Sequence, residues 1–99
     1  MSDELVAREA LKHFAEQIDL GEIVVRRASA EPDIRQDGSP VTRMMLVLKD
    51  PDGDTWGVEP LRELRTVLGR KAVELGLSGV SLTLLDESGP EAAEQFAER

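Results

Sequence analysis

Three aspartates spaced two residues apart, Asp50, Asp52 and Asp54, are the residues of this chain whose spacing most resembles a metal site. Carboxylates at the first, third and fifth positions are the ligands with which a calcium-binding loop begins. Such a loop also needs glycine at its sixth position and glutamate at its twelfth, and this chain has Thr55 and Leu61 there. The sequence therefore predicts a tight turn over this segment, with its proline setting the backbone angle, and no metal site.

The remaining residue types give little support for catalysis. The chain has no cysteine and no tyrosine, so it lacks a thiol nucleophile and a phenolic acid or base. Its one histidine, His13, lies beside Glu9 and Glu16 on the polar side of an expected helix. Neither a phosphate-binding glycine motif nor a nucleophile paired with a base is present. We therefore expect a protein that is not an enzyme and that binds no cofactor.

Composition and charge limit the class of protein. Ninety-nine residues with an apolar fraction of 40% predict a single domain over residues 1–99, whose α+β class follows from the order of the elements below. The net charge is −8, with the acidic excess near the two ends, whereas residues 21–50 carry five acids and five bases. A negative field repels phosphate, which argues against nucleic acid. The sequence shows no signal-peptide pattern and no apolar run of membrane-spanning length, so we expect a soluble cytoplasmic protein with no membrane contact. Nine arginines against three lysines are typical of a bacterial genome rich in G and C.

Hydrophobic periodicity predicts the elements. Apolar residues at three- and four-residue intervals indicate helices, and alternation indicates strands. A capping box formed by Ser88 and Glu91 predicts a short C-terminal helix. The expected order is helix 2–20, strand 22–29, strand 41–49, helix 59–75, strand 78–85 and a last helix from residue 88. The fold class is therefore α+β, with a three-stranded mixed or antiparallel sheet and the helices mainly on one face.

Local signals refine these boundaries. Gly21 and Gly76 follow the two long helices where left-handed C-terminal caps are expected. The alternation of the first strand breaks at Arg26 and Arg27, which predicts a bulge or the exposed end of the strand. Pro32, Pro40 and the pair Asp37–Gly38 mark the connection between the first two strands as a long hairpin.

The segment 41–49 is apolar on both of its faces and is expected to be the central strand. Thr42, Met44, Leu46 and Leu48 fall on one face, and Val41, Met45 and Val47 fall on the other. One face should receive the helices. The second face needs another cover, which can be the C-terminal helix or another molecule.

This second face motivates the leading functional hypothesis, a non-catalytic protein-interaction module. Its predicted partner-binding residues are Val41, Met45 and Val47, together with Trp56 from the loop before the second long helix. Methionine adapts well to such surfaces, and tryptophan is enriched in binding hot spots, although a lone tryptophan is more often a lid on the core. The expected partner is a second copy of the chain, giving a homodimer, or another protein to which this chain is an accessory or antitoxin-like subunit.

The alternative hypothesis is nucleic-acid binding through arginines of the hairpin region. These residues are Arg26, Arg27, Arg35 and Arg43. If the hairpin protrudes, its local field can be positive although the chain is acidic.

Two resemblances to known families accompany these hypotheses. The order helix-strand-strand-helix-strand, followed by Asp86-Glu87-Ser88, resembles ribosome-binding factor A and KH-type domains, and this resemblance implies RNA binding. Such domains carry basic surfaces and a glycine loop or a helix kink, whereas Gly69 here stands in the tripeptide L-G-R. The run from Asp50 to Gly53 resembles a turn of glyoxalase-type modules, but the histidine ligands of that family are missing.

Overall fold

The computed structural model describes residues 3–53 and 55–90. It contains two helices and three strands: α1 (Asp3–Glu16), β1 (Val25–Ile34), β2 (Pro40–Leu48), α2 (Val58–Glu74) and β3 (Val80–Asp86). The predicted α+β class with a three-stranded mixed sheet is confirmed. The predicted C-terminal helix lies outside the described residues.

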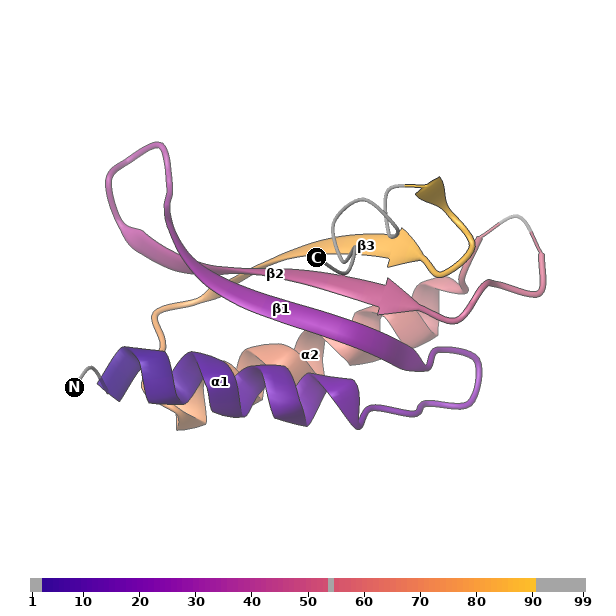
Figure 1. The fold of residues 1–99 in the computed structure, drawn as a ribbon, viewed down its shortest axis with the longest axis horizontal. Coiled ribbons are helices and arrows are strands. Elements are labelled where there is room, and N and C mark those ends of the chain that lie inside the picture. Colours follow the sequence, from indigo (N-terminus) through magenta and orange to yellow (C-terminus); the bar gives the residue numbers. More distant parts are fainter. Residues whose placement is uncertain (1–2, 54, 91–99) are drawn as a thin grey trace.

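The three strands form one sheet in the order β1-β2-β3, with β2 in the centre as expected. β1 and β2 are antiparallel and joined by a hairpin, whereas β2 and β3 are parallel and connected through α2. Both helices lie on the same side of the sheet, and the β1–β2 hairpin curls away from them (Figure 1). We call the side without the two helices the outer face.

The core lies between the helices and the sheet. Met44, Leu46 and Leu48 of β2 are fully buried there, as alternation along the strand predicts. They meet Leu11 of α1 and Leu64 of α2, which come from the apolar stripes of the two helices. Further members of this core are Ala7, Ala15, Ile18, Ile23, Val25, Ala28, Leu68, Ala72 and Leu77.

The first helix ends earlier than its sequence pattern predicts. It stops at Glu16, not at Leu20, because the chain turns back around Gly21, whose φ of +85° suits glycine. The amide of Leu20 donates to the carbonyl of Ile23 at 2.8 Å, and the amide of Val25 donates to that of Ile18 at 3.1 Å. The prediction that Gly21 caps the helix is therefore wrong. Ile18 is buried, but it belongs to this turn and not to the helix.

The first strand extends further than residues 22–29, toward the predicted turn at Asp37–Gly38. β1 continues past Ser29 to Ile34, and Pro32 is tolerated because β1 is an edge strand. The register with β2 shifts between Val25 and Arg27, which confirms the predicted irregularity at the two arginines. At the tip, the amide of Arg35 donates to the carbonyl of Ser39 at 2.9 Å, and Gly38 has a φ of +90°.

The end of α2 agrees with its sequence signal. Gly76 adopts a φ of +82°, and its amide donates to the carbonyl of Val73 at 3.0 Å. The amide of Leu77 reaches back to the carbonyl of Ala72 at 2.9 Å, which completes a Schellman-type cap. This cap turns the chain toward β3, and Leu77 enters the core.

Candidate functional site

The outer face carries three of the four residues predicted to bind a partner. Val41, Met45 and Val47 alternate with the core residues of β2 and therefore point away from the helices. Val41 and Val47 are buried, and Met45 is half-buried. Val47 and Leu85, its register partner on β3, form a small apolar cluster separate from the main core.

Met45 occupies an uncharged row of this face. Its register partners are Ser29 on β1 and Thr83 on β3, both small and polar. The next row toward the hairpin contains Glu31 and Arg43, whose side chains form an ion pair at 3.1 Å. The middle row of the outer face, which contains Ser29, Met45 and Thr83, therefore carries no charge.

The fourth predicted residue, Trp56, lies elsewhere. Its ring packs against the main core on the helix side, and its indole N–H donates to the carbonyl oxygen of Lys49 at 2.8 Å. The structure therefore does not bring Trp56 together with Met45. Its contacts are those of a lid that covers the core and fixes the chain after β2.

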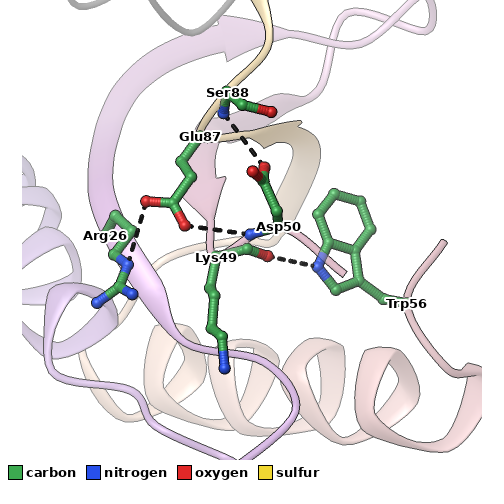
Figure 2. A network of polar contacts seen from close by, with 6 residues as sticks. All are labelled: Arg26, Lys49, Asp50, Trp56, Glu87 and Ser88. Carbon is green, nitrogen blue, oxygen red and sulfur yellow. Dashed lines mark hydrogen bonds and ion pairs between the residues drawn. The ribbon is translucent and has the colours of Figure 1, made fainter. Parts of the chain in front are cut away.

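The ends of the parallel strands are joined by a network of polar contacts, shown in Figure 2. The side chain of Glu87, just after β3, accepts from the amide of Asp50 at 3.2 Å and forms an ion pair with Arg26 at 3.4 Å. Asp50, just after β2, accepts from the amide of Ser88 at 3.2 Å. We call these residues, with Lys49 and Trp56, the strand-end network. It ties the start of β1 to the loops that follow β2 and β3.

A related contact fixes the start of α2. The Glu22 carboxylate accepts from the amide of Gly57, the N-cap residue, at 3.0 Å. A Cβ at Gly57 would stand 3.2 Å from both carboxylate oxygens of Glu22, so glycine permits this close approach. The turn before β1 and the loop before α2 are thereby held together.

The strand-end network holds the loops after β2 and β3 together. Each of its two carboxylates accepts from a backbone amide of the other loop, as expected for a structural contact. His13 lies on α1, 3.9 Å from a carboxylate oxygen of Glu16, and its side chain is 69% exposed. Within residues 3–53 and 55–90, no group of three or more histidine or acidic residues is placed to hold a metal ion. Asp54, the third aspartate of the run, lies outside the described residues.

The four arginines of the alternative hypothesis do not form one basic cluster. Arg26 is paired with Glu87, and Arg43 is paired with Glu31. Arg35 lies against the start of β3, where its Nη2 atom is 2.7 Å from the position that a Cβ on Gly79 would take. Arg27 of β1 is the register partner of Val47 on β2. The positive charges of Arg26 and Arg43 are therefore balanced by neighbouring carboxylates.

One carboxyl group at the hairpin tip has a shifted pKa. The hydroxyl and the amide of Ser39 both donate to the Asp37 carboxylate, at 2.6 and 2.9 Å. These hydrogen bonds stabilise the charged form and lower the pKa of Asp37, with a smaller contribution from Arg35. They stabilise the turn.

The strand-end network was not among the sites predicted from the sequence. The signal was present, because a strand-helix-strand connection implies parallel strands, and the residues that follow parallel strands meet at one edge of the sheet. Asp50 and Glu87 each follow such a strand. Their meeting depends on the register Leu48 with Asp86, which the residues alone do not specify.

Comparison of the chain with protein-family models, with curated proteins and with solved structures finds no match. The KH-type resemblance therefore rests on the order of the elements alone. In the part of the chain that the structure describes, neither helix has the length and apolar character needed to cross a membrane.

Proposed function

We propose that this chain is a non-catalytic, cytoplasmic protein-interaction domain that associates with a second copy of itself through its sheet. The observation that carries this proposal is the contrast between the sheet and the polar contacts around it. The carboxylates of Asp50 and Glu87 are engaged in holding loops together. The row of Ser29, Met45 and Thr83, in contrast, carries no charge and lies outside the main core. Uncharged surface of this kind favours contact with protein.

Solution mass measured by light scattering over a wide concentration range tests self-association. We expect a dimer whose dissociation constant falls as salt is raised, because salt screens the repulsion between two chains of net charge −8. A monomer at every concentration and at high salt would contradict the proposal.

A second candidate is an accessory or antitoxin-like subunit that binds a basic protein. The net charge of −8 favours it, because complementary charge speeds association with a positive partner. In that case the half-buried Met45 of the outer face is the proposed contact residue, because Val41 and Val47 are already buried within the chain. Replacing Met45 by aspartate should weaken such a complex, whereas replacing the exposed Val73 of α2 by aspartate, which adds the same charge elsewhere, should not.

Nucleic-acid binding remains the alternative, and the ion pairs of Arg26 and Arg43 count against it. Retention on a generic RNA or DNA matrix distinguishes it, because such retention weakens with salt whereas the proposed dimer strengthens. Retention at low salt that is lost when Arg26 and Arg27 are both replaced by glutamate would support the alternative.

A further inference from the structure

The two edges of the sheet differ in how they are protected. β1 carries charged residues along its length, a proline at position 32 and a register shift between Val25 and Arg27. Charges, proline and bulges are the features by which edge strands avoid pairing with another chain. β3 has none of these over residues 80–85, which read V-S-L-T-L-L and follow β2 without a shift.

The backbone of β3 directs alternate residues toward its free edge. The carbonyl of Gly79 accepts from Thr42 of β2 at 3.0 Å, and the amide of Glu87 donates to the carbonyl of Leu48 at 2.9 Å. Odd-numbered residues therefore face β2, and the N–H and C=O groups of even-numbered residues face outward. The outward groups are those of Val80, Leu82 and Leu84. Within the described residues, no strand lies beyond β3 to pair with them.

The side chains of β3 on the helix side are also incompletely covered. Val80, Leu82 and Leu84 pack against the core but stay half-buried, whereas Met44 and Leu46 on the neighbouring strand are fully buried. On the outer face, Ser81 and Thr83 are exposed. β3 therefore offers both unpaired backbone groups and apolar surface at the same edge.

We propose that a second copy of this chain pairs with β3 in antiparallel orientation, with Leu82 on the twofold axis. This inference rests on the proposed self-association and places its interface at the free edge of β3, beside the uncharged row of Met45 and not on the outer face itself. In this register Leu82 lies opposite the partner's Leu82, and Val80 lies opposite the partner's Leu84. Both are hydrogen-bonded pairs, because all of these residues direct their backbone groups outward.

The same register also pairs similar residues on the outer face of the two copies. Ser81 lies opposite the partner's Thr83, so hydroxyl faces hydroxyl while apolar residues face apolar residues on the helix side. A shift that places Thr83 on the axis would instead set Ser81 against the partner's Leu85 and Val80 against the partner's Asp86. The sequence of β3 is self-complementary about Leu82, as an interface between identical copies requires. The result is a continuous sheet with the helices of both copies on one side.

Two double variants at exposed positions test this register. Ser81→Lys with Thr83→Lys places like charges directly opposite each other twice across the axis, and we expect the dimer dissociation constant to rise by about tenfold or more. The rise cannot come from general repulsion, because the two lysines reduce the net negative charge of each chain. Ser81→Glu with Thr83→Lys places opposite charges across the same pairs, and this variant should stay dimeric.

Two further variants test whether the rise in the dissociation constant comes from the edge of β3. Thr66→Lys with Val73→Lys adds the same charge at exposed positions of α2 and should leave the dimer intact. Met45→Asp distinguishes pairing at the edge from contact through the outer face, because Met45 lies on β2, the strand next to β3. Pairing at the edge leaves this variant dimeric, whereas contact through the outer face dissociates it. Circular dichroism establishes that each variant is folded. If the double lysine variant does not fold, hydrogen exchange of wild-type amides decides, because those of Val80, Leu82 and Leu84 should be protected only in the dimer.

The outcomes separate this inference from the proposal on which it rests. A dimer that the two lysines leave unchanged, or one that Met45→Asp dissociates, would overturn pairing through β3 while self-association stands. Loss of the dimer in the glutamate–lysine variant would overturn the register. A wild-type monomer at every concentration would overturn both, and protection of the even-numbered amides in that monomer would mean that the same chain covers this edge.

Discussion

Leu46 and Met45 are adjacent in β2, yet they serve two different faces of the sheet. Leu46 is fully buried between the sheet and the helices, whereas Met45 is half-buried between the small side chains of Ser29 and Thr83. The helix-side face is assembled from apolar residues of every element. The outer face combines one small apolar cluster with an ion pair and hydroxyl groups. The stability of the fold should therefore come mainly from the helix-side face, and the outer face is left free to take part in binding.

The largest expected effect tests this difference directly. Leu46→Ala should lower the free energy of unfolding by about 2–5 kcal/mol, because it removes buried methyl groups and leaves a cavity. Met45→Ala, the matched change on the other face, should cost about 1 kcal/mol or less. Urea unfolding of both variants at a concentration where the protein is monomeric measures the two values. Equal losses would mean that the outer face is as much a core as the helix side.

A smaller effect is expected at the lid of the helix-side core. Trp56→Phe keeps most of the apolar contact but removes the indole N–H that bonds to the carbonyl of Lys49. The loss should be about 1 kcal/mol, the usual contribution of one hydrogen bond. Thermal unfolding checks it. A loss as large as that of Leu46→Ala would assign Trp56 a central place in the core.

On the outer face, the ion pair between Glu31 and Arg43 should contribute little. Their side chains are 61% and 47% exposed, so water and salt weaken their attraction. A double-mutant cycle with alanine at each position should give a coupling of about 0.2–1 kcal/mol that falls further at high salt. A larger coupling that resists salt would contradict the view that this face adds little stability.

The smallest effect is expected at the hairpin tip, which belongs to neither face. The pKa of Asp37 is lowered in the folded protein, so its charged form stabilises the turn above the unfolded pKa, near 3.8. This contribution should disappear as pH falls through the folded pKa. The stability difference between the wild type and Asp37→Asn should therefore shrink below that pH. A difference independent of pH would show that charge at Asp37 has no role.

The sequence was most informative where a local signal coincided with burial. The two-faced pattern of residues 41–49 identified the central strand, and Gly76 marked the end of α2 correctly. Local signals failed at Gly21, where tertiary pairing of Ile18 with Val25 replaced the last helical turn. They also could not place Trp56 on the helix side or bring Asp50 to Glu87, because both depend on how distant strands are aligned.

The crossover from β2 through α2 to β3 has a consequence for the order of folding. β1 and β2 are joined by a tight turn, so closing their hairpin costs little chain entropy, whereas Thr42 meets Val80 only after the whole of α2 is in place. We expect the hairpin to be structured in the folding transition state and β3 to join late. Destabilising substitutions in β3 should then mainly accelerate unfolding, whereas those in the hairpin should mainly slow folding, which stopped-flow kinetics can measure. The strand with the uncharged free edge would thus be the last to be positioned and the first to be released.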